Sequence, residues 1–214
     1  MALLECARYS ECLGNMFIIG LTGGIGTGKT EICRILKDLG AYVIDADRIV
    51  HEGYRNNNKI QTAVVEEFGV EIVSSDGGIN RAQLASVVFE DYHALRRLNK
   101  IIHPLVLKEM QSQLHKLRFS GTEVVVVEVP LLVEAGWNSI FDEIWVTVVD
   151  EQTAIRRIME RSSLSSKKIR ARIKSQTDDG ARLSIADAVI DNTADVPALE
   201  DRVRELWRNR VSLT

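Results

Sequence analysis

The sequence lacks several features that would mark a secreted, membrane or nucleic-acid-binding protein. Its three cysteines, Cys6, Cys12 and Cys33, have no metal-ligand spacing and form no disulfide framework, which fits a reducing cytosol. A formal net charge of −3 gives no global field that would favour nucleic acid. No apolar run approaches the ~18 residues that a membrane helix needs. We therefore expect a cytoplasmic protein with neither nucleic acid nor a membrane as a partner.

Internal repeats and low-complexity segments are also absent, and residues 1–15 lack the basic start and apolar centre of a signal peptide. A chain of 214 residues, of which 45% are apolar and 27% charged, can bury one sizeable core. Residues 1–15 show no clear period, and Met16 stands just before the first predicted strand. We predict an N-terminal extension over 1–15. Either Met16 is the working start, or the extension is a loosely docked segment.

The most informative stretch is a glycine-rich loop between a predicted strand and a predicted helix. The apolar run 17–21 predicts a buried strand, and the residues Gly23–Thr30 that follow have the form G-x-x-x-x-G-K-[ST]. Apolar residues at helical spacing over 32–39 predict a helix directly after the loop. Strand, loop and helix follow in the order that this motif requires. We therefore favour a phosphate-binding loop over a glycine-rich turn without a ligand.

The loop residues predict a nucleoside triphosphate as the ligand. Glycines allow the positive φ angles at which successive backbone N–H groups converge on an anion. Lys29 is expected to reach the β- and γ-phosphates, and the Thr30 hydroxyl to hold Mg²⁺. The dinucleotide pattern G-x-G-x-x-G is absent, because Lys29 follows Gly24 and Gly26 where that pattern needs its third glycine. A nucleoside triphosphate is therefore favoured over NAD.

Two aspartates follow the second predicted strand, which spans 41–44. The carboxyl ends of strands in an open parallel sheet line the ligand crevice, so this strand should end beside the phosphate loop. On an extended chain, Asp45 and Asp47 point to one face. One would accept a proton from an attacking hydroxyl, and the other would order Mg²⁺ waters or position Arg48. The alternative is that one of the two merely caps the next helix.

Residues 48–120 are mainly helical by pattern and form a predicted insertion between the second and third strands. A residue that precedes proline avoids the helical region, so His103-Pro104 is expected to break a helix here. By analogy with kinases of this architecture, such an insertion would hold the acceptor. His103 is a candidate substrate ligand, although a lone histidine before proline is more often structural.

Three further strands are predicted over 123–129, 143–149 and 186–192, which makes five in an α/β order. A basic helix–loop–helix hairpin at 156–176 suits a lid that closes, excludes water and neutralises the transferring phosphate. Most of its basic residues are expected to form a solvated face. Arg157 and Arg161, four residues apart on one helical face, are the exceptions. The last strand should finish where adenine would sit, beside Asn192.

Seven segments, in order along the chain, resemble the dephospho-CoA kinase family. They are LTGGIGTGKT, VIDADRIV, IIHPLV, VPLLVE, the R-R-I-M-E-R entry to the hairpin, RIKSQ and ADAVIDN. The glycine loop alone occurs in many nucleotide-binding families, whereas the ordered set runs from about 16 to 210. The resemblance implies a three-layer α/β/α P-loop fold with a five-stranded parallel sheet. It also implies a core at 16–58 and 121–214, a helical CoA-binding insertion at 59–120 and a helical lid at about 156–176.

The resemblance further implies that ATP phosphorylates the ribose 3′-hydroxyl of dephospho-CoA, with Mg²⁺, in the last step of coenzyme A synthesis. Catalytic roles would fall to Asp47 as the base, to Lys29 and to Arg161, and Thr30 would hold the metal. The residues expected to bind ATP are Gly24, Gly26, Thr27, Gly28, Lys29, Thr30, Glu31, Arg157 and Asn192. Those expected to bind the acceptor are Asp45, Asp47, Arg48, His103, Leu131 and Glu134.

Two other functions stay open on the sequence. The first is another small-molecule P-loop kinase, similar to shikimate or nucleotide kinases, although the glycine triplet of shikimate kinases is not found. The second is a nucleotide-binding switch, but the guanine-selective pattern N-K-x-D fails because Ile102 stands where aspartate is needed. The last predicted helix would pack either internally or against a copy. We expect a monomer or a weak homo-oligomer.

Overall fold

The structure is a computed structural model that describes residues 16–162, 164–174, 176 and 178–211, so the predicted extension over 1–15 lies outside the described residues. The chain divides into two compact units. The first unit comprises Met1–Ile44 and Leu117–Thr214, and the second comprises Asp45–Lys116. Among the described residues, no helix combines the length and the apolar composition that a bilayer crossing requires.

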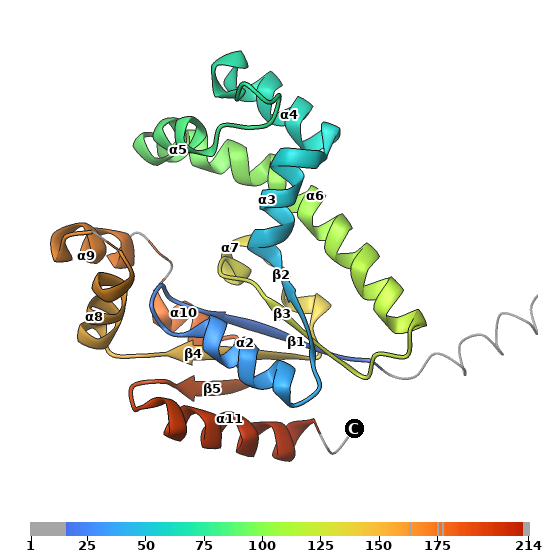
Figure 1. Ribbon diagram of the computed structural model, residues 1–214, viewed down its shortest axis with the longest axis vertical. Coiled ribbons are helices and arrows are strands. Elements are labelled where there is room, and N and C mark those ends of the chain that lie inside the picture. The colour runs from blue at the N-terminus through green and yellow to red at the C-terminus, as the bar shows by residue number, and fades with distance from the viewer. Residues whose placement is uncertain (1–15, 163, 175, 177, 212–214) are drawn as a thin grey trace, which may run out of the picture. The chain divides into compact units, whose positions relative to one another are not determined.

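The first unit is built on a five-stranded sheet with the order β2-β3-β1-β4-β5 (Figure 1). Its strands are β1 (Phe17–Gly23), β2 (Tyr42–Asp45), β3 (Val124–Glu128), β4 (Glu143–Val148) and β5 (Ala188–Asp191). Strand β1 pairs in parallel with both β3 and β4, and β4 pairs in parallel with β5. The predicted five-stranded parallel α/β fold is confirmed. Each predicted strand occurs, and its ends differ from the predicted ends by at most two residues.

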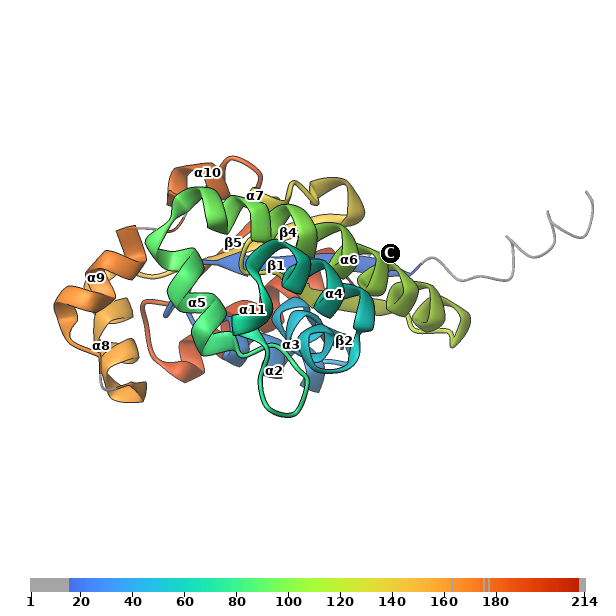
Figure 2. The ribbon, with the colours of Figure 1, turned by 90° about the horizontal axis from the view of Figure 1, so that it is seen from above.

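Helices cover both faces of this sheet. The helices of the first unit are α2 (Lys29–Asp38), α7 (Leu132–Ala135), α8 (Glu151–Arg161), α9 (Ser166–Lys174), α10 (Asp179–Leu183) and α11 (Val196–Arg210), with a 3-10 turn η2 (Asn138–Ile140). Helix α11 packs against α2 on one face, and α10 packs on β1 and β4 on the other (Figure 2). Helices α8 and α9 pack together as the predicted hairpin.

The main core of the first unit lies between the sheet and the pair α2 and α11. Alternate residues of β1 point into it, as the two-residue period of a strand requires. The largest side chains with less than 2% of their surface exposed in this core are Ile19, Leu21, Ile32, Ile35, Leu36, Trp145 and Ile190. On the opposite face, a Cβ at Gly20 would stand 2.8 Å from the Phe141 ring. Glycine at this position therefore lets the Phe141 ring pack directly on the backbone of β1.

The second unit is helical, as predicted for this part of the chain. It contains α3 (Ala46–Asn56), α4 (Asn58–Phe68), a 3-10 turn η1 (Val70–Ile72), α5 (Arg81–Glu90) and most of α6 (Tyr92–Phe119). A small antiparallel bridge between Val73 and Ile79 interrupts the helices. Asn57 and Asn80 are the N-caps of α4 and α5, and each side chain accepts hydrogen bonds from two backbone N–H groups of its helix.

The predicted helix break at His103-Pro104 is wrong, because α6 continues through Pro104 for 28 residues. Proline removes one backbone hydrogen bond and costs roughly 3 kcal/mol inside a helix. An apolar stripe at four-residue spacing offsets that cost, since each fully buried side chain contributes about 1.5–3 kcal/mol. The buried residues of the stripe are Leu98, Ile102, Val106, Met110 and Leu114.

Candidate active site

The glycine loop Gly23–Thr30 connects β1 to α2 at the carboxyl edge of the sheet. Gly26 and Gly28 have φ angles of +80° and +89°, in the left-handed region that only glycine adopts readily. Gly28 is the N-cap of α2, so the unpaired N–H groups of the first helical turn open into the loop. This arrangement of backbone donors and helix N-terminus is suited to an anion.

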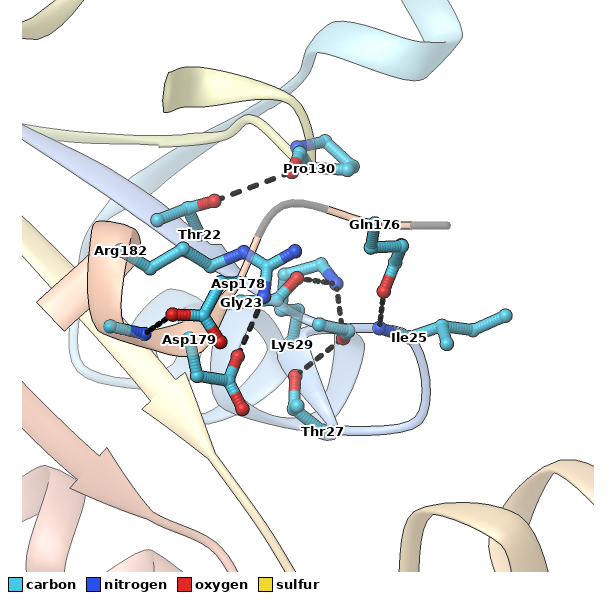
Figure 3. Close-up of polar contacts among 12 residues, drawn as sticks. Thr22, Gly23, Ile25, Thr27, Lys29, Pro130, Gln176, Asp178, Asp179 and Arg182 are labelled. Atoms are coloured by element: carbon cyan, nitrogen blue, oxygen red, sulfur yellow. Dashed lines mark hydrogen bonds and ion pairs between the residues drawn. The ribbon is translucent and has the colours of Figure 1, made fainter. Parts of the chain in front are cut away.

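The Lys29 ammonium lies within the loop. Its Nζ donates to the carbonyl oxygens of Gly23 and Gly24 at 3.0 and 3.1 Å, and the Thr27 hydroxyl donates to Gly24 O at 2.9 Å (Figure 3). Two backbone carbonyls therefore orient the ammonium within the loop. The loop thus carries a positive charge that is placed in advance, which reduces the ordering needed when an anion binds.

Side chains from distant strands hold the loop in this shape. The Thr27 carbonyl oxygen accepts the Asn192 side-chain amide at 2.8 Å and the Thr147 hydroxyl at 3.1 Å. Both donors are buried, and both lie at the carboxyl edge, on β4 and just after β5. Asn192, predicted to bind the nucleotide, thus supports the loop directly. A Cβ at Gly28 would come within 2.1 Å of the Asn192 amide nitrogen, so only glycine fits there.

The connection after α9 also reaches the loop. The Gln176 side-chain oxygen accepts the backbone N–H of Ile25 at 2.8 Å (Figure 3). Arg182, on α10, lies beside Gly24. Sequence reasoning missed Thr147, Gln176 and Arg182 as site residues. The sequence carries a signal for two of them, because Gln176 ends the segment RIKSQ and Arg182 stands shortly before ADAVIDN.

The two arginines predicted from the hairpin have different environments. Arg157 is half-buried, and its Nη2 donates to the Ala194 carbonyl at 3.4 Å. Its Nη1 is buried and has no hydrogen-bond partner among the described residues, and it lies 3.9 Å from the Cβ position at Gly28. A buried guanidinium nitrogen without an acceptor is costly unless a ligand supplies one. Arg161 is the last residue of α8 and is exposed.

The carboxylates at the mouth of the loop offer few metal ligands. Over the described residues, no group of three or more His, Cys, Asp or Glu side chains is placed to hold a metal ion. Thr30 is exposed in the first turn of α2, and Glu128 ends β3 with one carboxylate oxygen 3.5 Å from the Cys33 sulfur. Mg²⁺ is commonly coordinated by oxygen ligands such as the Thr30 hydroxyl, phosphate oxygens and water. The residues present therefore fit a nucleotide-bound Mg²⁺ rather than a metal held by protein alone.

Two other carboxylates at this edge of the sheet remain ionised at neutral pH. Hydrogen bonds from Thr153 lower the pKa of Asp150, the N-cap of α8. Hydrogen bonds from Thr193 lower the pKa of Asp191, at the end of β5. Both carboxylates are bound to their own turns, so they shape the loops around the site.

In the second unit, the premise that Asp45 and Asp47 share one face of an extended chain is wrong. Strand β2 ends at Asp45, and α3 begins at Ala46. The Asp45 carboxylate accepts the Arg48 backbone N–H at 3.1 Å and caps α3, which was the alternative. Asp47 is an exposed residue of the first turn. The helix begins one residue after the strand because this cap satisfies one of its unpaired N–H groups.

The other predicted acceptor ligands lie on helices. The Arg48 side chain pairs with Glu52 at 2.7 Å, an exposed pair of small energetic value. His103 is half-buried within α6. In the first unit, Leu131 is the exposed N-cap of α7, and Glu134 is an exposed residue of that helix.

Comparison with known proteins identifies the family. Residues 17–198 match the model of the family described as dephospho-CoA kinase. The chain belongs to the dephospho-CoA kinase family. A dephospho-CoA kinase of Dehalococcoides mccartyi is 41% identical over 198 residues, which cover 92% of this chain and all of the relative. A dephospho-CoA kinase of Geobacter sulfurreducens is 40% identical over 195 residues, covering 91% of this chain and 99% of the relative. The predicted resemblance is confirmed.

Solved structures agree with this membership of the dephospho-CoA kinase family. A dephospho-CoA kinase from Campylobacter jejuni is similar with a TM-score of 0.68 and 25% identity, covering 91% of this chain and 97% of that one. The protein TT1252 from Thermus thermophilus has a TM-score of 0.77 and 28% identity, covering 92% and 98%. A shikimate kinase from Acinetobacter baumannii, with a TM-score of 0.53 and 17% identity over 96% of this chain and 98% of that one, shares the fold alone.

The support that Asn192 gives to the loop leads to a testable expectation. Asn192→Ala should lower the free energy of unfolding by about 1–3 kcal/mol, because it removes one donor to the buried Thr27 carbonyl. The same variant should weaken ATP binding, because the loop loses that anchor. Chemical denaturation and calorimetry measure the two effects, and Asn138→Ala, at an exposed position in the same unit, is the control. Unchanged ATP affinity would mean that Thr147 alone keeps the loop in shape.

Proposed function

We propose that this chain phosphorylates dephospho-CoA with ATP at the loop Gly23–Thr30, in the reaction that gives coenzyme A and ADP. The observation that carries the proposal is the Lys29 ammonium. It is held by two carbonyls inside a positive-φ glycine loop that opens α2, in a chain of the dephospho-CoA kinase family. The ribose 3′-hydroxyl is the acceptor, and the γ-phosphate of ATP is the group transferred.

Phosphoryl transfer has a largely dissociative transition state, so positioning and charge neutralisation supply most of the catalysis. The backbone N–H groups of the loop, including those of Gly26 and Gly28, hold the phosphates. Lys29 neutralises charge between the β- and γ-phosphates. Thr30 would hold Mg²⁺, which would supply positive charge against the negative charge of the phosphates. Glu31 follows Thr30 in the first turn of α2, and its carboxylate pairs with Arg34 at 2.8 Å. We therefore place Glu31 at the edge of the nucleotide site.

The nucleoside end of ATP is assigned to Arg157 and Asn192. The Arg157 guanidinium stands beside Gly28 with a buried nitrogen that lacks an acceptor among the described residues, and Asn192 anchors the same part of the loop. Arg161 belongs to the same helix, at the entry of the lid hairpin. We assign it to the transferring phosphate when the hairpin closes, since a mobile arginine can neutralise charge and exclude water.

The acceptor is assigned to the helical insertion at 59–120 and to the residues that flank it. Asp47 would accept the proton of the attacking hydroxyl, while Asp45 keeps α3 in place through its cap and Arg48 contacts the acceptor's phosphate groups. His103, Leu131 and Glu134 complete the proposed acceptor set. Asp47 suits the role of base because its carboxylate is exposed in the first turn of α3, where an acceptor hydroxyl can reach it.

A coupled ADP-release assay tests the proposal, with dephospho-CoA, shikimate and water as alternative acceptors and Mg²⁺ present. We expect turnover that depends on dephospho-CoA, with a product that carries one additional phosphate on the ribose by mass spectrometry. Turnover with shikimate would instead assign the chain to another small-molecule kinase. Slow turnover with water alone, together with a preference for GTP, would indicate a nucleotide-binding switch.

A further inference from the structure

Arg182, on α10, is the one charged residue that the described part of the chain buries as deeply as its apolar core. Only 3% of its surface is exposed. Helix α10 packs on β1 and β4, so the residue stands on the sheet face opposite α2 and next to the glycine loop. Burying a guanidinium is expensive unless acceptors surround it, which makes this position unlike that of a surface arginine.

The guanidinium faces the loop. Its Nη1 lies 3.7 Å from the point where a Cβ on Gly24 would stand, and Figure 3 shows the group beside Gly23 and Lys29. One pocket of about 310 Å³ is lined both by loop residues, among them Gly24 and Thr27, and by Arg182. The loop and the buried cation therefore share a cavity.

The cavity is lined by two cations, Lys174 and Arg182, and by three carboxylates. Of these carboxylates, Glu151 pairs with Arg170, and Asp178 accepts the Gly180 N–H as the N-cap of α10. Arg182 Nη1 forms an ion pair with Asp179 at 2.6 Å, and the Asp179 side chain is 58% exposed. The Lys29 ammonium, also beside Gly24, is bound by carbonyl groups that carry no net charge. A guanidinium has five N–H donors in a planar fork, and one monodentate carboxylate contact leaves donors for another group. Two cations thus stand beside Gly24: the Lys29 ammonium, and the Arg182 guanidinium, whose ion-pair partner Asp179 is largely exposed to solvent.

We propose that Arg182 donates to the terminal phosphate of ATP beside Lys29 and is a further catalytic residue of the reaction, with Asp179 as its positioning residue. This inference rests on the proposed function. The terminal phosphate is favoured because a loop lysine reaches the β- and γ-phosphates, and both cations lie beside Gly24. A guanidinium fork on the equatorial oxygens would stabilise the charge that spreads over them during transfer. The donor is already in place in the folded chain, so it requires no lid closure.

The test compares Arg182→Met, which keeps the length of the side chain and removes the charge, with Arg182→Lys and with Arg204→Met. Arg204 is a surface residue of α11 that pairs with Glu200, and it serves as the matched control. Calorimetry with Mg²⁺ measures the binding of a non-hydrolysable ATP analogue and of ADP, without any acceptor. We expect Arg182→Met to weaken binding of the ATP analogue about tenfold or more, because a charge-assisted hydrogen bond is lost, and to leave ADP binding nearly unchanged.

Turnover gives the second readout. Arg182→Met should lower kcat about 10²–10³-fold, the usual loss when one preorganised donor to a transition state is removed. Arg182→Lys should recover part of kcat, and Asp179→Asn should lower it less than Arg182→Met does. If Arg182→Met does not fold, the comparison of the ATP analogue with ADP on Arg182→Lys decides the question in its place.

Equal weakening of the ATP analogue and ADP, in parallel with a lower melting temperature, would overturn the proposal and make Arg182 a structural residue. Unchanged binding and unchanged kcat would overturn it as well. The proposed function fails separately, if the unmodified chain binds ATP and does not phosphorylate dephospho-CoA. A selective loss for the ATP analogue in that case would still support Arg182 as a ligand of the terminal phosphate.

Discussion

Lys29→Ala is expected to lower kcat by about 10²–10³-fold, in line with the removal of one preorganised donor from a transition state. The ammonium stands within the glycine loop, where two backbone carbonyls hold it at 3.0 and 3.1 Å. Without it, negative charge between the β- and γ-phosphates loses its nearest cation in the loop. The measurement is the steady-state rate of ADP release with saturating dephospho-CoA and ATP.

The control for this variant is Lys37→Ala. Lys37 is exposed in the last turn of the same helix, α2. Its variant therefore removes one positive charge, as Lys29→Ala does, without a change in the loop. Lys37→Ala should retain its kcat and its melting temperature. If Lys29→Ala turned over at the same rate as Lys37→Ala, the loop would not be the site of phosphoryl transfer.

Asp47→Asn is expected to reduce kcat by about 10²–10⁴-fold, the range typical of a lost general base. The substitution keeps the size of the side chain and removes its ability to take up a proton at neutral pH. ATP affinity should stay nearly intact, because the phosphates are assigned to the loop and Asp47 belongs to α3. Pre-steady-state turnover and ATP calorimetry on the same sample separate the two quantities.

Asp45→Asn and Glu52→Gln are the matched variants for Asp47→Asn. Asn is itself a good N-cap, so Asp45→Asn should keep α3 folded and lose little stability, whereas Asp45→Ala should lose about 0.5–2 kcal/mol. Glu52 pairs with Arg48 on the exposed side of the same helix, and its variant tests a change of charge alone. Full turnover by Asp47→Asn would remove it as the base and make Asp45 the candidate.

Those parts of the fold and site whose signals are local could be predicted from the sequence. Strand β1, the loop and α2 follow one another within Phe17–Asp38, and each is specified by its own residues: an apolar run, glycines and a helical period. The lid hairpin is also local, because α8 and α9 are adjacent in sequence. For the same reason Lys29 and Thr30 could be named as site residues with no knowledge of the tertiary structure.

The remainder depends on competition between effects that sequence patterns do not rank. Pro104 signals a helix end, yet packing along α6 outweighs the hydrogen bond that it removes. The segment Asp45-Ala46-Asp47 is compatible with a strand, and capping by Asp45 converts it into the start of a helix. The contacts of Thr147 and Gln176 with the loop join residues that are 120 and 151 positions apart in the sequence. The burial of Arg182 beside the loop is likewise a tertiary property, which no local pattern reports.

The anchoring of the Thr27 carbonyl has a consequence for how the protein is made. Thr147 and Asn192, which lie 120 and 165 residues further along the chain, donate to it. On a translating ribosome, the loop therefore emerges long before the groups that hold it in shape. A nascent chain stalled before β5 should bind nucleotide only weakly, and affinity should rise when the last strand has left the exit tunnel.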